Sequence, residues 1–252
     1  MATKESLEQT ITIGGRRHYR IPDTEGNIRF LPSVTTIIDA MTDKSSLEAW
    51  KRRVGEAEAN RISTFSANRG TCMHQMLEYW FESEKANDTE RLDEMHHKMA
   101  SFIKENGYTD EEYGVGRSLF ESLRICGIFE RVKRIIESEN TLYSFTKGGY
   151  AGRVDCVYEN VVGDHVLLDF KTARHRKSRR MLDNYYLQLG AYYVAYWQMH
   201  HVKLHHGELW VAVENDAPQI VTVTSDELKE SALRFLAMVE EFHKRYDNNQ
   251  NK

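Results

Sequence analysis

Three residues with ionisable side chains stand in segments that otherwise have the sequence of buried strands. In residues 166–172 the side chains alternate between two faces, so Asp169 and Lys171 share one face while the apolar residues between them point to a core on the other. Asp155 is a single acid among the apolar residues of 150–157. A short turn between the two strands would place it beside Asp169.

This arrangement predicts a particular kind of chemistry. Carboxylates on adjacent strands repel each other unless a cation lies between them, and hard oxygen ligands suit Mg²⁺ or Mn²⁺. Such an ion can neutralise a phosphodiester oxygen and lower the pKa of a bound water, while Lys171 holds that water or helps to deprotonate it. Two simpler interpretations remain open, a salt bridge on an edge strand and a surface hairpin with two solvated acids.

A histidine at the margin of a predicted helix could complete the metal site. The apolar residues of 71–81 recur at helical spacing, and Thr71, His74 and Glu78 lie three and four residues apart beside them. The apolar stripe consists of Met73, Met76, Leu77, Trp80 and Phe81. A histidine in such a place is commonly structural, but a neutral imidazole is also a good metal ligand.

Two further groups of residues are suited to contact a nucleic acid. A basic run follows the strand of Asp169 and consists of Arg174, Arg176, Lys177, Arg179 and Arg180. Such a run is either a solvated loop or a phosphate-binding surface. On the next predicted helix, Gln188 and Tyr192 lie one turn apart, flanked by Tyr185 and Tyr196. This stripe is typical of core packing, but it could also contact a phosphate or stack on a base.

Periodicity and turn signals indicate which elements position these residues. The first half is predicted to open with one or two strands in 10–21, to become helical from Ser33 or Thr35, and to stay mostly helical over 67–146, with breaks at 106–107 and 114–116. The second half is predicted to contain strands at 150–158, 166–172, 208–214 and 219–224, a helix at 184–199 and a last helix capped by Thr224 and Glu227.

The order of these elements predicts an α/β fold in which helices pack on a mixed central sheet. We expect one domain over residues 1–252. It would comprise an N-terminal region of strands and helices (1–146) that carries His74, a catalytic core (147–224) and a C-terminal helix (225–252).

Composition limits the classes of protein to consider. The 252 residues are 40% hydrophobic and 29% charged, which is typical of a globular domain, and the net charge of −4 means that any surface for nucleic acid must be local. The three cysteines are far apart and indicate neither a disulfide framework nor a zinc knuckle. Residues 1–12 lack the features of a signal or transit peptide, and no segment has the roughly 18 apolar residues of a membrane span. We therefore expect a cytoplasmic protein.

Taken together, the motifs resemble those of the RecB-like branch of the PD-(D/E)XK nuclease superfamily, and within it the mitochondrial genome maintenance exonucleases and related phage exonucleases. The resemblance spans roughly residues 30–200, and it is the order of the motifs that makes it specific. The matching segments are 31–35 with 48–50, Gly70-Thr71-x-x-His74-x-x-x-Glu78, Gly152-Arg153-Val154-Asp155, Asp169-Phe170-Lys171-Thr172 and Gln188-x-x-x-Tyr192.

The resemblance implies roles for the acidic and basic residues of these motifs. His74, Asp155 and Asp169 would be metal ligands, assisted by the backbone carbonyl of Phe170, and Lys171 would be the catalytic lysine. The metal would be Mg²⁺ or Mn²⁺. Relatives that hold an iron–sulfur cluster use four cysteines, and this chain has three. No iron–sulfur cluster is therefore expected.

The resemblance also implies residues that contact DNA. Gln188 and Tyr192 would position the strand, together with Thr71 and the basic run. The family has a catalytic glutamate before the first core strand. Glu139 matches it, and Glu137 is a close alternative.

These expectations describe a Mg²⁺-dependent DNA exonuclease that acts on single strands or free ends in replication, recombination or repair, alongside other proteins of those processes. A helical arch from the first half would admit the strand, and the basic run would lead it to the metal site. The lack of a transit peptide favours a phage or bacterial setting. Three alternatives remain: a structure- or sequence-selective endonuclease, a non-catalytic DNA-binding protein with the same fold, and an enzyme unrelated to nucleic acid.

Overall fold

A five-stranded mixed sheet forms the centre of the molecule in the computed structural model, which describes residues 10–246. Its strands lie in the order β4 (Val132–Ser144), β5 (Tyr150–Asn160), β6 (His165–Ala173), β7 (His206–Val213) and β8 (Gln219–Val223). All neighbours are antiparallel except β6 and β7, which are parallel and joined by a crossover through α7 (Asp183–His200). The predicted α/β fold with a mixed sheet is confirmed.

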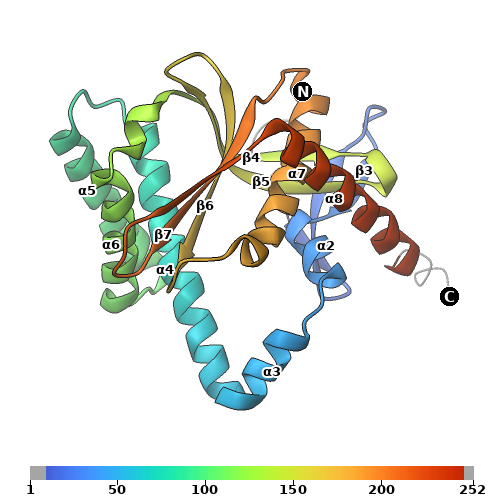
Figure 1. The fold of residues 1–252 in the computed structure, drawn as a ribbon, viewed down its shortest axis with the longest axis horizontal. Helices are drawn as coiled ribbons and strands as arrows, with labels where there is room; N and C mark the ends of the chain where they lie inside the picture. The colour runs from blue at the N-terminus through green and yellow to red at the C-terminus, as the bar shows by residue number, and fades with distance from the viewer. Residues whose placement is uncertain (1–9, 247–252) are drawn as a thin grey trace.

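Helices cover both faces of this sheet (Figure 1). On one face, α2 (Val34–Met41), α7 and α8 (Ser225–Tyr246) pack with the strands into one apolar cluster. On the other face, α4 (Glu56–Glu82), α5 (Asp88–Asn106) and α6 (Asp110–Ile125) form a second cluster with them. The alternation of β6 divides its side chains between the two, because Leu167 belongs to the first cluster and Leu168 and Phe170 to the second. Both faces of β6 are therefore buried.

A smaller antiparallel sheet, formed by the N-terminal strands, packs against β5 of the large sheet. It contains β1 (Thr10–Ile13), β2 (Arg16–Pro22) and β3 (Ile28–Pro32), so the predicted strands around the first turn are confirmed and β3 is an addition. Its apolar side chains Tyr19, Ile21 and Leu31 pack on Ala151 of β5. Ser33 then caps α2 by accepting a hydrogen bond from the backbone N–H of Thr36 at 3.0 Å.

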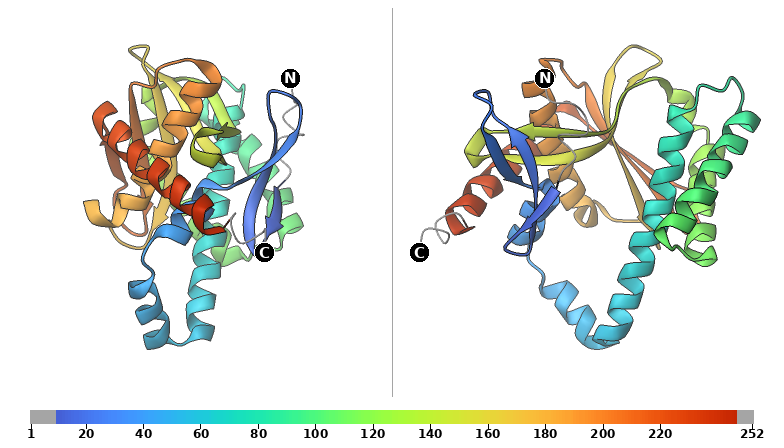
Figure 2. Two further views of the ribbon diagram at one scale, coloured as in Figure 1. Left: turned by 90° about the vertical axis from the view of Figure 1, so that its right-hand side faces the viewer. Right: turned by 180° about the vertical axis from the view of Figure 1, so that it is seen from behind.

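The helical arm, which we define as α3 (Ser45–Val54) and α4 as far as Ser66, projects from the body of the protein (Figures 1 and 2). No residue of α3 is buried. The contacts of α3 are made mainly with α4, and α4 meets the start of α6 from Arg61 onward. From Arg69 onward α4 enters the body and packs on α6 and β6.

Two sequence expectations about the first half are wrong. Residues 132–144 form the edge strand β4 instead of helix, so the sheet begins at 132 and not within the predicted core of 147–224. The segment is polar and only half-buried over most of its length, so it lacks the apolar alternation that marks a strand. Gly114 and Gly116 lie within α6 and do not break it. A Cβ on Gly116 would lie 2.8 Å from the Arg69 carbonyl oxygen, so this glycine allows α6 and α4 to approach closely.

The start of the last helix follows the predicted pattern. Thr224 and Glu227 form the expected capping box: the Glu227 carboxylate accepts from the Thr224 N–H at 2.9 Å, and the Glu227 N–H donates to the Thr224 hydroxyl at 3.3 Å. Residues 1–9, on which the expectation about a signal peptide mainly depends, lie outside the described residues. Within 10–246, no helix is long and apolar enough to cross a membrane.

Candidate active site

Three of the four predicted catalytic residues line a cavity of about 1070 Å³ that lies between α4, strands β4 to β6 and the loop after β6, and the fourth, Asp169, is buried beside Lys171. His74, Glu139, Asp155 and Lys171 line it, and Thr71 stands at its margin on α4. The acids are neither on a surface hairpin nor freely solvated, because the Asp155 side chain is 13% exposed and that of Asp169 is 1% exposed. The surface-hairpin interpretation is therefore wrong.

The position of His74 follows from the close packing of α4 on β6. Gly70 lies at this contact, where a Cβ would be at an ordinary van der Waals distance of 3.4 Å from the Thr172 hydroxyl. One turn later the His74 imidazole meets the ring of Phe170 edge-on, and its Nδ1 lies 3.7 Å from Asp155 Oδ2. Burial lowers the pKa of His74 below its ordinary value, although the charge of Asp155 opposes the shift. The imidazole is therefore neutral at pH 7, the form that binds metals.

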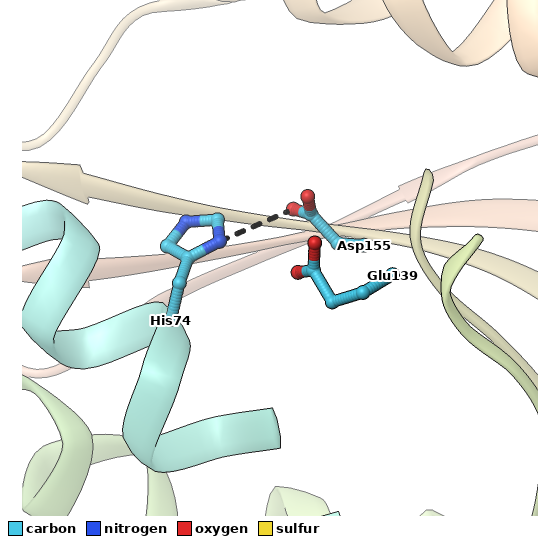
Figure 3. A group of neighbouring side chains, drawn as sticks. All are labelled: His74, Glu139 and Asp155. Carbon is cyan, nitrogen blue, oxygen red and sulfur yellow. Dashed lines mark ion pairs between the residues drawn. The ribbon is translucent and has the colours of Figure 1, made fainter. Parts of the chain in front are cut away.

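Glu139 enters the site because the backbone of β4 is distorted there. Its φ of 51° is in the left-handed region, between the paired residues Ser138 and Asn140, so its side chain turns toward Asp155 (Figure 3). Arg153 fixes it twice, through an ion pair to its carboxylate at 2.8 Å and a hydrogen bond to its carbonyl oxygen at 2.9 Å.

Glu137, the alternative to Glu139, faces a different part of the molecule. Its carboxylate lies 3.8 Å from His200 Nε2 on α7 and accepts a hydrogen bond from the Asn140 side chain. Of the two glutamates, only Glu139 belongs to the cavity wall.

Asp169 and Lys171 form an ion pair inside the sheet, with Lys171 Nζ 2.5 Å from Asp169 Oδ2. Strand β6 lies between β5 and β7, so the interpretation of this pair as an edge-strand salt bridge is wrong. Burial raises the pKa of Asp169 to about 7, Lys171 opposes the shift and Asp155 adds to it. Burial also lowers the pKa of Lys171, but the carboxylates of Asp169 and Asp155 outweigh this and raise it. Lys171 is therefore a charged ammonium group at neutral pH.

The donor atoms at this site fit a hard divalent cation. His74, Glu139 and Asp155 each offer one ligand atom, and these atoms lie within 4.8 Å of one another (Figure 3). The Asp155 carboxylate is held in place, since its Oδ2, the oxygen 3.7 Å from His74 Nδ1, accepts the backbone N–H of Phe170 at 2.7 Å. Apart from its ion pair with Lys171, the Asp169 carboxylate has no hydrogen-bond partner in the part of the chain that the structure describes. Buried acids with open lone pairs and a neutral imidazole are the ligands that Mg²⁺ or Mn²⁺ would use.

One detail of this group differs from the sequence expectation. Glu139, expected as a catalytic acid, belongs to the three-residue ligand group, whereas Asp169, expected as a ligand, lies beside it and is paired with Lys171.

The comparison with protein families decides the identity of this fold. The model of the PD-(D/E)XK nuclease superfamily matches residues 46–251. The chain belongs to the PD-(D/E)XK nuclease superfamily. Asp169-Phe170-Lys171 matches the (D/E)XK part of the superfamily motif, and Asp155 lies before it in the sequence, on the neighbouring strand β5. The predicted superfamily is confirmed, and nucleases of this superfamily use divalent metals.

Two solved structures resemble parts of this PD-(D/E)XK nuclease. A candidate exonuclease from Eubacterium rectale is 16% identical, with a TM-score of 0.47 over 70% of this chain and 65% of its own. The protein SSO0001 is 15% identical, with a TM-score of 0.36 over 60% of this chain and 68% of its own. The present chain thus spans less than two thirds of the first neighbour. A comparison with curated proteins finds no matching relative.

The structure revises the predicted role of Tyr192 in this nuclease. The Tyr192 side chain is 3% exposed, so it has no surface for DNA. Its hydroxyl donates to the Arg153 carbonyl at 2.8 Å and lies 3.4 Å from the amide nitrogen of Gln188. A Cβ on Gly152 would lie 2.8 Å from the Tyr192 ring, so the glycine of this motif makes room for the tyrosine. Tyr192 holds the strand that carries Arg153, and the half-buried Gln188 lies next to it.

The basic run divides into two parts. Arg174 and Lys177 line the active-site cavity. Arg176 donates to the Ala217 carbonyl at 3.2 Å, and Arg179 lies over the Tyr186 ring and 3.5 Å from Glu227. Arg180 is exposed and lines a neighbouring hollow of about 600 Å³. Of the five basic residues, only Arg174 and Lys177 are therefore placed to contact a substrate in the cavity.

Three residues of the site were not singled out from the sequence. Arg153 could have been, since it lies two residues before Asp155 and so on the same face of the strand. Tyr185 lies beneath two cations, with Lys171 Nζ 5.2 Å and Lys177 Nζ 5.8 Å from its ring centroid. Arg69 is buried at the cavity wall, and no local pattern in the sequence indicates this.

Proposed function

We propose that this nuclease is a metal-dependent DNA exonuclease of the RecB-like branch, which acts on single strands or free ends during replication, recombination or repair. The observation that carries the proposal is the convergence of His74, Glu139 and Asp155 on one point of a wide cavity. The buried Lys171 and Asp169 lie beside that point. A protein that only bound DNA would gain nothing from acids that face a polyanion.

The residues of the site divide the work of hydrolysis. Hydrolysis joins a water oxygen to phosphorus and breaks one P–O ester bond, and the leaving oxygen takes up a proton. A divalent metal held by His74, Glu139 and Asp155 would supply positive charge to the phosphate and lower the pKa of the attacking water. Lys171, as an ammonium group, donates hydrogen bonds through Nζ and so holds the water or a phosphate oxygen. Its raised pKa favours this positioning role over proton abstraction.

The helical arm and the loop after β6 suggest how a strand reaches the metal site. Ser66 and Ala67, where the arm joins the body, line one side of the cavity, while Arg174, Lys177 and the exposed Met181 line the other. We propose that a single strand passes between them with its phosphates toward the cations.

The decisive experiment is incubation of end-labelled linear and circular single-stranded DNA with Mg²⁺, with Mn²⁺ or with EDTA. We expect mononucleotides or short products from the linear DNA only, no hydrolysis in EDTA, and loss of hydrolysis in Asp169→Ala and Lys171→Ala. Cleavage of the circular strand would instead identify an endonuclease. Hydrolysis in EDTA, or full activity of either variant, would exclude the metal mechanism.

The strand path has its own test, in which two cations of the same loop serve as a matched pair. Lys177→Gln should reduce the slope of log affinity against log salt by about 0.7, the value for one phosphate contact on a single strand. Arg179→Gln should leave the slope unchanged, because Arg179 is engaged with Tyr186 and Glu227. Equal slopes for wild type and Lys177→Gln would refute the path.

A further inference from the structure

A second, smaller cavity of about 250 Å³ lies next to the active-site cavity, where α4 and α6 meet the ends of β6 and β7. The two cavities share part of their walls, namely Ser66, Arg69 and Arg174. The remaining wall of the second cavity combines a third arginine, Arg61, with apolar side chains, including Phe65 and Ile62, and with the acids Glu111 and Glu214.

Arg69 is the unusual member of this wall. Its side chain is 3% exposed, one Nη atom pairs with Glu214, and its Nε–H has no hydrogen-bond partner among residues 10–246. Burial and the charge of Arg174 both lower its pKa. A buried N–H that makes no hydrogen bond costs free energy, and so does the approach of a second guanidinium. An ion pair that served only to join α4 to the end of β7 would require neither an unpaired Nε–H nor a second guanidinium nearby.

An anion in the cavity would remove both costs. A phosphate oxygen could accept the Nε–H of Arg69 and lie between the charges of Arg69 and Arg174. Arg69 and Arg174 are the cations that would face such an anion, since Arg61 is held by Glu58 through two hydrogen bonds of 2.7 and 2.8 Å. The side chains of Phe65 and Ile62 provide an apolar surface for the attached base.

We propose that this second cavity binds one nucleotide of the DNA strand next to the scissile phosphate, with its phosphodiester at Arg69 and Arg174 and its base against Phe65. This inference rests on the proposed function, because it takes the strand in the active-site cavity to be DNA. Arg69 is in this view a positioning residue, which sets the register of the strand relative to His74 and Lys171.

Substitution of the two partners of the buried ion pair separates this role from a structural one. Affinity of the full-length protein for a fluorescent single-stranded oligonucleotide is measured by anisotropy in EDTA over a range of salt. Arg69→Gln should weaken binding about tenfold and reduce the salt slope by about 0.7. Glu214→Gln should leave the slope unchanged and the affinity equal or tighter, because it removes a competing acid. Equal weakening by both variants would mean that the pair is structural only and would overturn the proposal.

Two further variants keep the test decisive if Arg69→Gln does not fold. Arg174→Gln changes an exposed side chain on the same wall and should also reduce the slope by about 0.7. Phe65→Ala should weaken binding without changing the slope, since it removes stacking and no charge. A slope equal to that of wild type in Arg174→Gln would refute the site. Hydrolysis with Mg²⁺ is assayed separately, so an inactive wild type would count against the proposed function and leave the binding result intact.

Discussion

Asp169 and Glu208 are both buried carboxylates on neighbouring strands of the large sheet, and their surroundings differ in an instructive way. Asp169 lies on β6 and Glu208 on β7, where Glu208 is paired with Leu168. Their side chains are 1% and 4% exposed. Burial alone would raise the pKa of both groups.

Glu208 is surrounded by donors. One of its oxygens accepts from the Tyr158 hydroxyl at 2.9 Å and from Trp210 Nε1 at 2.7 Å, and the other lies 3.3 Å from Arg131 and 3.6 Å from His206. Burial raises its pKa, but these hydrogen bonds outweigh burial and lower it below the ordinary value. Glu208 is therefore a satisfied structural acid.

Asp169 has a single cationic partner, Lys171, and no other hydrogen bond, and its pKa is raised to about 7. The contrast shows that burial by itself does not identify a functional carboxylate. What distinguishes Asp169 is that, among the described residues, its carboxylate has no hydrogen-bond donor other than Lys171, and it lies on the strand next to Asp155, which lines the cavity.

The largest expected difference between the two acids is in activity. Asp169→Asn should lower the rate of DNA hydrolysis with Mg²⁺ at least about 100- to 1,000-fold, because the amide cannot supply the negative charge that a metal requires. Glu208→Gln, the matched control, should stay within about threefold of wild type. Initial rates on end-labelled single strands measure both, after circular dichroism has shown that each variant is folded. Similar losses in the two variants would contradict the comparison.

The second expected effect is on stability, where the hydrogen-bonded acid Glu208 should matter. Glu208→Ala should lower the free energy of unfolding by about 4 kcal/mol, because Tyr158 and Trp210 each lose the acceptor of a buried hydrogen bond and packing is lost as well. The midpoint of urea unfolding at constant slope measures it. Within residues 10–246 the exposed acid Glu58 pairs only with Arg61 on its own helix, so Glu58→Ala should leave the midpoint unchanged. An unchanged midpoint in Glu208→Ala would show that its hydrogen bonds do not stabilise the fold.

The sequence predicts one of these acids much better than the other. The alternation of 166–172 places Asp169 and Lys171 on one face, and this needs only local periodicity. The donors to Glu208 come from residues 131, 158, 206 and 210, on three different strands or their flanks. Which buried acid is satisfied depends on tertiary contacts, and no local pattern reports them.

The same limit explains the other differences between prediction and structure. Strand β4 is an edge strand with a polar sequence, so it lacks the apolar alternation that identified β5 and β6. Glu139 reaches the metal site only because its φ is 51°, a local distortion that its neighbours in the sequence do not indicate. Tyr192 was expected to position DNA because the resemblance implied it, and packing on Gly152 buries it.

Proton linkage should separate the two acids a third time, with opposite signs. In EDTA, Asp169 has a folded pKa of about 7, above the unfolded value near 3.8, so the native state binds an extra proton between these limits. Its contribution to stability is therefore lost as the pH rises from about 4 to 7, by about 3 kcal/mol. For Glu208 the folded pKa is lowered, so its contribution is present above its unfolded pKa and is lost as the pH falls through the folded value.

The measurement is the difference in unfolding free energy between each variant and wild type, from pH 4 to 8 for Asp169→Asn and from about pH 6 down to about pH 3 for Glu208→Gln. Asp169→Asn should become more stable relative to wild type as the pH rises, whereas Glu208→Gln should approach wild type as the pH falls. A pH-independent difference for Asp169→Asn would mean that its carboxyl group titrates normally in the folded protein.

The smallest expected effects come from two buried tyrosine hydroxyls, one beside Glu208 and one beside the active site. Tyr158 donates to Glu208, and Tyr192 donates to the Arg153 carbonyl behind Glu139. Replacement of either by phenylalanine should cost about 1 kcal/mol of unfolding free energy, because each removes one buried hydrogen bond. Only Tyr192→Phe should also slow DNA hydrolysis, by about fivefold or 1 kcal/mol, since Arg153 then holds Glu139 less firmly. If Tyr158→Phe slowed hydrolysis as much, the satisfied acid on β7 would be coupled to the metal site, and the division between structural and functional carboxylates would not hold.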